Sequence, residues 1–464
     1  METKKQKSIH YEKDVLGKIA VSNDHFWGAT TQRSLQYFSI GQEKIPLEFI
    51  YAYVVYKKCA AITNYRLKLL SLSKKKQIVQ ICQKILDHQF DQEFPLHIWQ
   101  GGSGTHTHMN VNEVIANLCH HFFPKEPNIN PHDDVNRSQS TNDSFISSFH
   151  IFVALSLHKK LIPSLLYLIS VFHQKELEYH SILKLGRTHL QDAVPLTFGQ
   201  EFSGYVALLK NSLEQIQSSL QYIYPLAAGG MAVGTVLNTD PRFGHWMVQE
   251  IKKETHLPFQ SASNTFALLS SHNGILAVSN AMNVLATNLL KIANDIRWLG
   301  SGPTAGLNEL VLPSNESGSS IMPGKVNPTQ CEMITMISIQ VMANHLAVSI
   351  ANSQGNFELN VFNPLMLYNM SQSIHLLSDG CKSFADHCIR GLKVNITKVQ
   401  GYVENALSLA TFFNPVIGYD KAAHLVRFAL DKHISLRQAN EQLHYLSTKE
   451  YDSILSHFIS FQTK

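Results

Sequence analysis

Apolar residues recur at helical spacing through the long middle part of the chain. In one stretch they follow one another at steps of four and three, the spacing of a single helix face in a bundle. This stripe consists of Val278, Met282, Leu285, Leu289, Ile292 and Ile296. Similar spacing covers residues 149–179, 198–222, 332–353 and 360–391. The pattern predicts a mainly all-α fold built on a long central helical bundle.

The chain on either side of this region differs from it in pattern. We expect residues 1-143 to form an N-terminal mixed and helical domain, residues 144-397 the central bundle, and residues 398-464 a small C-terminal helical domain. Several central stretches are apolar on more than one face, which indicates burial by neighbouring subunits as well as within one chain. We therefore expect the bundle to assemble into a homotetramer.

Composition narrows the class of protein. The 464 residues are 44% hydrophobic and 16% charged, and the net charge of +4 gives no reason to expect a nucleic-acid partner. Six cysteines without CxxC spacing fit reduced thiols. The longest nearly apolar run, residues 161–172, is shorter than the roughly twenty residues that a membrane span needs. The basic residues 1–8 lack an apolar segment. We expect a cytoplasmic protein with no membrane partner.

A polar loop precedes one of the apolar stretches. Residues 314–328 are rich in Gly, Ser and Pro, a composition typical of loops. Ser319, Lys325 and Asn327 carry groups that can hold a carboxylate. Pro328 stands where the next helix should begin, and a helix N-terminus adds free N–H groups and partial positive charge. The pattern indicates an anion-binding loop that also places a serine for proton abstraction. The alternative is a plain connection between helices.

Three other polar segments carry candidate ligand-binding groups. Residues 100–110 place hydroxyls among glycines, and residues 130–143 place short polar side chains before an apolar helix, where they can also act as helix caps. In residues 186–195 the hydroxyl of Thr188 stands beside the imidazole of His189.

His106 and His108 form an H-x-H pair, which raises the question of a metal. No third ligand stands at a suitable spacing, so we expect no metal and no cofactor.

These motifs together resemble a known family. Gly318-Ser-Ser-Ile-Met-Pro-Gly-Lys-Val-Asn-Pro328 resembles the signature of the fumarase/aspartase superfamily, and the continuation Thr329-Gln-Cys-Glu332 is similar to the class II fumarase branch. His189 points to the same branch, because aspartases typically have Gln there. The resemblance runs from about Ile9 to the end of the chain.

The resemblance implies an activity and an assembly. Class II fumarases (fumarate hydratases) are metal-independent carbon–oxygen lyases of the tricarboxylic acid cycle that hydrate fumarate reversibly to (S)-malate. They abstract a proton next to a carboxylate of a small dicarboxylate substrate. Their homotetramers have a core of about twenty helices, a long-bundle arrangement, and each active site draws on three subunits.

The resemblance also implies residue roles. Ser319, His189 and Glu332 would be catalytic, with Glu332 pairing with His189. Substrate binding would fall to Ser103, Thr105, His108, Ser140, Thr141, Asn142, Thr188, Ser320, Lys325 and Asn327. A second anion site would involve Asn130, His132 and Asp133, and Asp143 would have a capping role.

Several positions depart from the family pattern. Gln and Asn would be expected where His106 and His108 stand, Asn130 and His132 have changed places, and Thr304 and Asp240 replace Arg and His. The chain is thus a divergent member. Two alternatives to a fumarase stay open, an aspartase-like or other succinyl-compound lyase and a catalytically weakened paralogue that keeps the tetrameric scaffold.

Overall fold

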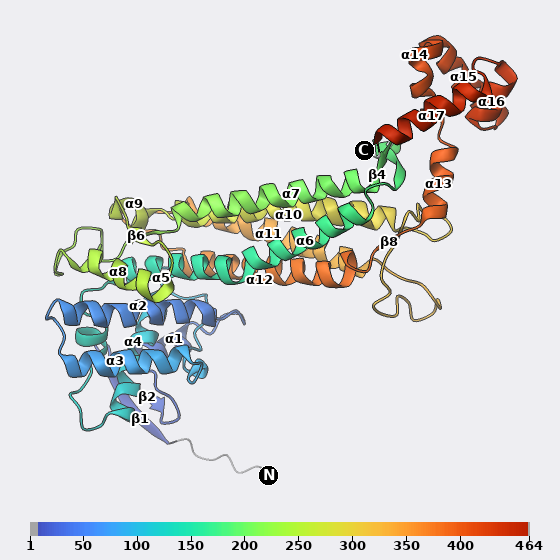
Figure 1. The fold of residues 1–464 in the computed structure, drawn as a ribbon. Helices are drawn as coiled ribbons and strands as arrows, with labels where there is room; N and C mark the ends of the chain where they lie inside the picture. The colour runs from blue at the N-terminus through green and yellow to red at the C-terminus, as the bar shows by residue number, and fades with distance from the viewer. Residues whose placement is uncertain (1–7, 463–464) are drawn as a thin grey trace. The chain divides into compact units, whose positions relative to one another are not determined.

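The computed structural model describes residues 8–462, with the side chains of residues 457–462 left out. Most of the basic N-terminal segment, residues 1–7, lies outside this range. Helices dominate the described chain, which confirms the predicted mainly all-α fold (Figure 1). Two compact units are formed, the first from Met1–Ile162, Glu214–Val284 and Gln340–Leu377, the second from Pro163–Leu213, Leu285–Ile339 and Ser378–Lys464. The predicted three-domain division stays a prediction.

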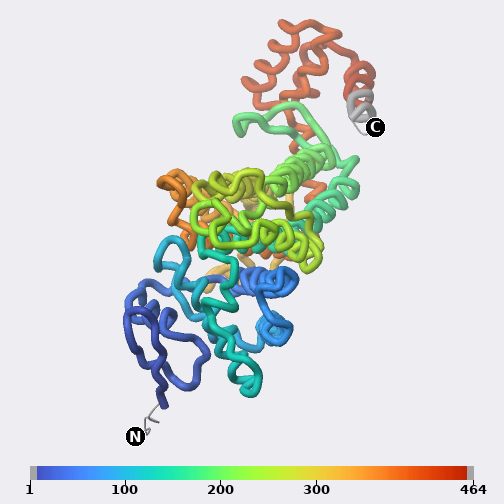
Figure 2. Tube along the Cα trace, turned by 90° about the vertical axis from the view of Figure 1, so that its left-hand side faces the viewer, coloured from blue at the N-terminus to red at the C-terminus, as the bar shows by residue number. Residues whose placement is uncertain are grey.

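The first unit is built around the apolar helix α2 (Leu47–Arg66), which lies beside α3 (Leu72–Leu86) in both ribbon and tube views (Figures 1 and 2). Ser71 caps the N-terminus of α3, because its side chain accepts a hydrogen bond from the backbone N–H of Lys74. The other elements confined to this unit include β1 (Ile9–Asp14), β2 (Gly17–Ser22), α1 (Ala29–Tyr37), α4 (Thr105–Phe122), the π-helical turn η2 (Pro131–Val135), α5 (Thr141–Ser156), β5 (Pro225–Leu226), α8 (Phe243–Thr255), β6 (Gln260–Ser261) and α9 (Thr265–Ser270).

Short strands in the first unit form small pairs. β1 and β2 pair antiparallel, and β5 and β6 pair parallel. Arg33 on α1 donates to the Asp14 carboxylate at 2.7 Å, and this bond lowers the pKa of Asp14. The N-terminal hairpin is thereby tied to the first helix.

The second unit holds a β-hairpin and the C-terminal helices. Leu185 of β3 joins an apolar cluster with residues such as Phe413, Leu425 and Tyr451, so these helices pack on the hairpin. Its elements are α6 (Ile162–Glu178, whose first residue is in the first unit), β3 (Leu183–Thr188), β4 (Gln191–Thr197), β7 (Leu310–Val311), β8 (Lys393–Val394), α13 (Ile396–Glu404), α14 (Asn414–Ile417), α15 (Tyr419–Lys432), α16 (Leu436–Leu443) and α17 (Thr448–Gln462).

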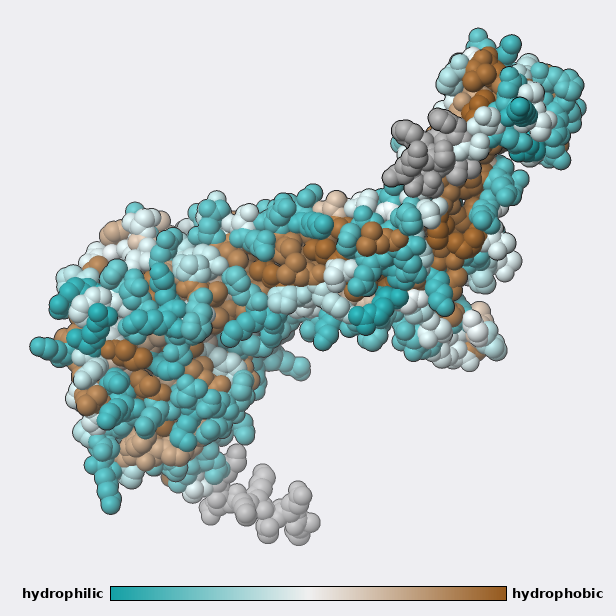
Figure 3. Space-filling model, in the orientation of Figure 1, coloured by the Kyte–Doolittle hydropathy of each residue, from teal (hydrophilic) through white to brown (hydrophobic). Residues whose placement is uncertain are grey.

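Four long helices contribute residues to both units: α7 (Phe198–Ser219), α10 (Asn273–Leu299), α11 (Thr329–Asn352) and α12 (Asn363–Phe384). The predicted stripe from Val278 to Ile296 lies on α10 and is fully buried. On α11, Met336, Ile339, Leu346 and Ile350 are instead between 55% and 65% exposed. Figure 3 shows hydrophobic residues gathered along the long helices.

Several helices in the structure are longer than the continuous apolar runs of the sequence, and they are apolar on average over their length. Among the described residues, Thr141–Glu178, Asn273–Leu299 and Thr329–Asn352 are long and apolar enough to cross a membrane by length and composition alone. The window on α11 is the least buried of the three.

Candidate active site

The N-terminus of α4 presents the first group of predicted substrate contacts. Ser103 Oγ and Thr105 Oγ1 lie 2.9 Å apart beside Gly104, which takes the left-handed conformation at φ 82° and caps the helix without a side chain. A Cβ on Gly104 would lie 2.2 Å from the Phe145 ring, so glycine is required for close packing as well as for conformation. The first turn of α4 can therefore offer backbone N–H groups together with two hydroxyls.

The N-terminus of α5 presents the second group. Ser140 and Asp143 form a capping box, in which Asp143 accepts the N–H of Ser140 at 2.9 Å. Asp143 also accepts the N–H groups of Gly229 and Met231, which fastens this helix to a glycine-rich turn. Burial raises the pKa of Asp143 to about 7. These contacts give Asp143 the structural role expected for it, and they leave the hydroxyl of Thr141 at the partly exposed edge of the site.

His108 lies directly behind that edge. It is 1% exposed, its Nδ1 is 2.7 Å from Thr141 Oγ1, and its Nε2 is 2.7 Å from Asn136 Oδ1 and 2.8 Å from Lys57 Nζ. Both ring nitrogens thus have protein partners, and in this arrangement the ring can act on a ligand only through its neighbours.

His106 and His108 do not converge on one point. His106 Nδ1 is 3.1 Å from Ser34 Oγ, whereas His108 contacts Thr141 and Asn136. Within the described part of the chain, no group of three His, Cys, Asp or Glu residues could hold a metal ion.

The predicted second anion site is a π-helical turn whose donors are already used. Asn130 Oδ1 accepts the N–H groups of His132 at 2.8 Å and Asp133 at 3.0 Å. The side chains of all three residues are exposed. The exchange of Asn and His at this turn therefore places a capping carboxamide on the N–H groups that an anion would need.

In the second unit, Ser319 lies on the loop between β7 and α11, where its hydroxyl oxygen has two backbone partners. Ser319 Oγ accepts the N–H groups of Ile321 at 3.2 Å and Met322 at 3.0 Å. Donors on this oxygen favour its deprotonated form, which is what a serine base requires. Lys325 and Ser320 are exposed on the same loop.

The loop is folded back on itself at Gly318. Asn327 Nδ2 donates to the Gly318 carbonyl at 2.5 Å, and a Cβ on Gly318 would lie 2.1 Å from the Lys325 carbonyl oxygen. Helix α11 begins at Thr329, directly after Pro328, as predicted. These contacts confirm a loop at the start of a helix.

Thr188 and His189 lie at the tip of the hairpin formed by β3 and β4, where we had expected only a turn. Thr188 pairs with Gln191, so His189 and Leu190 form the two-residue connection, with φ of 55° and 60°. Such a turn usually takes Asn or Gly, because both central residues are left-handed. The imidazole at this strained position is exposed.

A buried ion cluster anchors the hairpin. Arg187 and Lys184, both on β3, form ion pairs with Glu309, which immediately precedes β7, and Lys184 also pairs with Glu201 at 3.0 Å. Glu309 therefore links the strand that leads to His189 with the segment that leads to the Ser319 loop. The sequence analysis did not identify this residue.

The expected pairing of His189 with Glu332 is not present in the single chain. Both side chains are exposed, and among the described residues no hydrogen bond or ion pair joins them. The predicted site residues are divided between the two units, and those of the second unit lie on the hairpin tip, on the Ser319 loop and on α11.

Comparison with known proteins decides the family. A model described as a lyase matches residues 17–343, and one described as the fumarase C C-terminus matches residues 409–458. The chain is 50% identical to the class II fumarate hydratase of Thermosynechococcus vestitus over 446 residues, which is 95% of each chain. The chain belongs to the class II fumarase family.

Further relatives agree with this assignment. The class II fumarate hydratase of Helicobacter pylori is 48% identical over 96% of this chain and 97% of its own. The crystal structure of recombinant class II fumarase from Schistosoma mansoni superposes with a TM-score of 0.94 at 41% identity, covering 96% of this chain and 98% of that one. The resemblance of the signature loop to the fumarase branch is thereby confirmed.

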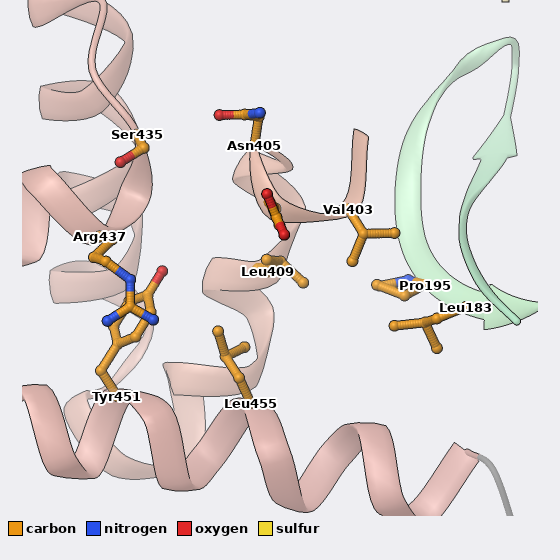
Figure 4. A pocket seen from close by; sticks show the side chains of 10 residues that line it. Leu183, Pro195, Val403, Asn405, Leu409, Ser435, Arg437, Tyr451 and Leu455 are labelled. Atoms are coloured by element: carbon orange, nitrogen blue, oxygen red, sulfur yellow. The ribbon is translucent and has the colours of Figure 1, made fainter. Parts of the chain in front are cut away.

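A cavity of about 440 Å³ in this class II fumarase chain lies apart from the predicted site residues (Figure 4). Leu183 and Pro195 of the hairpin face it from one side, and Arg437 and Tyr451 of the C-terminal helices from the other. Arg437 lies over the Tyr451 ring and pairs with Asp452, so its charge is already balanced. The cavity belongs to the packing of the hairpin on the C-terminal helices.

Proposed function

We propose that this protein is a class II fumarate hydratase, which interconverts fumarate and (S)-malate by reversible hydration. The observation that carries the proposal is the Ser319 hydroxyl, held by two backbone N–H groups on a loop with Lys325 and Asn327. Relatives of 45–50% identity over nearly the full chain carry that name, and none of the similarities favours an ammonia-lyase.

In the direction of dehydration, the alkoxide of Ser319 takes the proton from the carbon next to one carboxylate of malate. The electron pair passes into that carboxylate, which then bears extra negative charge on its oxygens. Lys325, Asn327 and the N-terminus of α11 supply positive charge and donors for it. The electron pair then forms the double bond as the hydroxyl on the neighbouring carbon leaves, and this hydroxyl takes a proton from solvent to become water. Ser319 returns to the alkoxide by releasing its proton to solvent.

The remaining groups bind and orient the substrate. Ser103, Thr105 and the N-terminal residues of α5 offer hydroxyls and N–H groups for a carboxylate. His189, charged or oriented by Glu332 of another subunit, would hold the substrate or an ordered water. A group at the tip of a fixed hairpin suits that positioning role.

We further propose that the active protein is a cytoplasmic homotetramer acting in the tricarboxylic acid cycle, with each active site shared between subunits. The exposed apolar edge of α11 supports the assembly, because burial of such an edge by a neighbouring subunit is favourable. The division of the predicted site residues between the two units supports sharing. We propose no nucleic-acid or membrane partner.

Ultraviolet absorbance tests the activity. Purified protein is added to malate and, in parallel, to aspartate, and the appearance of fumarate is followed. Fumarate from malate alone is the expected result. Fumarate from aspartate would make the protein an ammonia-lyase, and no fumarate from either substrate with a folded tetramer would make it a weakened paralogue.

A further inference from the structure

Lys57 is a buried cation without a carboxylate partner. It lies on α2 within a run of apolar residues and is 1% exposed. No ion pair to a carboxylate is found for it among the described residues. Its Nζ instead lies 2.8 Å from His108 Nε2, 2.9 Å from Gln139 Oε1 and 3.3 Å from Asn136 Oδ1. Because burying an ammonium group is costly, this arrangement calls for a functional explanation.

The two amide oxygens are fixed in direction. Gln139 Nε2 donates to the carbonyls of Val135 and Arg137, each at 3.0 Å, and Asn136 Nδ2 donates to the Gln139 carbonyl at 3.2 Å. Their oxygens must therefore face Lys57. An ammonium group has three N–H donors, which matches these two oxygens and the ring nitrogen of His108.

The other nitrogen of His108 contacts Thr141, whose hydroxyl is a predicted substrate contact. Nδ1 lies 2.7 Å from Thr141 Oγ1, and Thr141 is only partly buried. A hydroxyl that accepts from Nδ1–H keeps its own hydrogen free to donate outward. A hydroxyl that donates to Nδ1 would present only a lone pair, which repels a carboxylate.

We propose that Lys57 and His108 form a buried relay that turns the Thr141 hydroxyl into a donor to the substrate carboxylate. The Lys57 ammonium donates to both Nε2 and the neighbouring Asn136 Oδ1, so the ring proton lies on Nδ1 and is donated to Thr141 Oγ1. The hydroxyl hydrogen of Thr141 then points to the ligand. Lys57 and His108 are positioning residues in this account, which rests on the proposed function.

The relay makes substrate binding depend on the charge of Lys57. When Lys57 loses a proton, two N–H donors remain for three acceptors. The ring proton can then move to Nε2, which is 2.7 Å from Asn136 Oδ1, and Thr141 must donate to Nδ1. Burial lowers the pKa of Lys57 well below its ordinary value, so this change comes at lower pH than for an exposed lysine.

Burial also shifts the pKa of other titratable groups around the relay. It raises the pKa of Asp143 to about 7, and it raises the pKa of Tyr53 and that of Cys82, the latter to about 12. His132, on η2, is exposed. Burial lowers the pKa of His108, so the ring stays neutral.

Two substitutions separate the relay from simple packing. In K57M the ring is free to place its proton on Nε2, and we expect KM for malate at neutral pH to rise about tenfold, the loss of one charge-assisted hydrogen bond. In H108N a shorter carboxamide replaces the ring, so the link between Lys57 and Thr141 is broken and KM should no longer depend on the charge of Lys57.

The dependence of KM on pH distinguishes the relay from a purely structural role of Lys57 and His108. For the wild type, KM should rise with pH, and the rise should come at lower pH than the loss of a proton from an ordinary lysine. This rise should be absent in both K57M and H108N. K58M is the matched control, because Lys58 pairs with Glu254 outside the relay, and it should keep the wild-type profile.

Binding of succinate, a dicarboxylate that cannot be dehydrated to fumarate, is measured by calorimetry on the same folded tetramers. The relay predicts weaker binding in K57M than in the wild type. A K57M variant with the same KM and pH profile as the wild type would overturn the relay but leave the proposed function standing. A wild-type protein that binds succinate but does not dehydrate malate would overturn the proposed function instead.

Discussion

At the scale of single residues, Ser319 is the group on which the chemistry depends. S319A should lower kcat by about two to four orders of magnitude, because the proton acceptor is lost while the loop keeps its backbone contacts. Initial rates measure the effect, and circular dichroism checks the fold.

S317A is the matched control for that change. Ser317 lies on the same loop and its hydroxyl donates to the Ser319 carbonyl at 3.2 Å, outside the proposed proton path. It should retain most of the activity. An S319A enzyme as fast as S317A would remove Ser319 from the mechanism.

His189 combines a required backbone conformation with a required side chain. H189N keeps a residue that tolerates left-handed φ, so the hairpin should remain stable, while the imidazole is lost. We expect kcat to fall at least tenfold, with the melting temperature little changed. An H189N enzyme of normal rate would show that the imidazole is dispensable.

His150 makes the stability of the folded protein depend on pH in the acidic range. Burial lowers its pKa from the ordinary value near 6.5 to about 4, although the carbonyls of Ile223 and Pro225, each 2.9 Å from Nδ1, act to raise it. A lowered pKa means that the unfolded chain binds a proton first, so stability is full above about pH 6.5 and falls as pH drops toward 4. Urea unfolding across this range measures it.

In H150Q that titrating group is absent. The slope of unfolding free energy against pH should become shallower by up to about 1.4 kcal/mol per pH unit. An unchanged slope would assign the acid dependence to other groups, such as His272, whose pKa burial lowers to about 3.

The roles of these residues could be predicted from the sequence to different degrees. Ser319 and His189 stand in long motifs and could be predicted. Lys57 could not, because a lysine in an apolar helix is usually at a solvated edge, and only the fold shows that three acceptors from two other segments surround it. His108 was predicted to touch substrate, and the structure puts it one hydrogen bond behind Thr141.

At the scale of elements, the hairpin of β3 and β4 depends on Glu309. E309Q removes the carboxylate partner of the largely buried Arg187, while Lys184 keeps Glu201, and we expect a loss of about 3 kcal/mol in unfolding free energy. KM should rise as well, because the hairpin carries His189. Chemical denaturation and malate kinetics measure the two effects.

E214Q is the control for that substitution. Glu214 is an exposed residue of α7, and its loss should change stability by less than about 0.5 kcal/mol. Equal stability of E309Q and E214Q would mean that the ion cluster does not hold the hairpin.

Elements with a strong helical period were predicted well, and the hairpin was not. The stripe on α10 is buried as its spacing requires. Residues 183–197 contain Gly186 and Pro195 and show no clear alternation, so the two strands were taken for a turn. The contact of Glu309 with β3 joins residues more than a hundred positions apart, which no local pattern can show.

At the scale of the whole molecule, the exposed edge of α11 should hold the tetramer together. The double variant I339R/L346R places charges on this edge, and we expect dissociation together with loss of activity, because the sites are shared. Light scattering gives the mass, and malate turnover gives the activity.

L430R is the corresponding control, since Leu430 is an exposed apolar residue of α15 in the C-terminal helices. It should remain tetrameric and active. A monomeric I339R/L346R protein that still turns over malate would contradict the shared site.

The most direct test of the central claim is the product formed from fumarate in D2O, followed by proton nuclear magnetic resonance. Hydration as proposed predicts malate carrying one deuterium on the carbon next to a carboxylate, formed by the wild type and almost absent with S319A. Fumarate that stays unchanged in the presence of folded wild-type tetramer, or malate formed equally fast by S319A, would contradict the account.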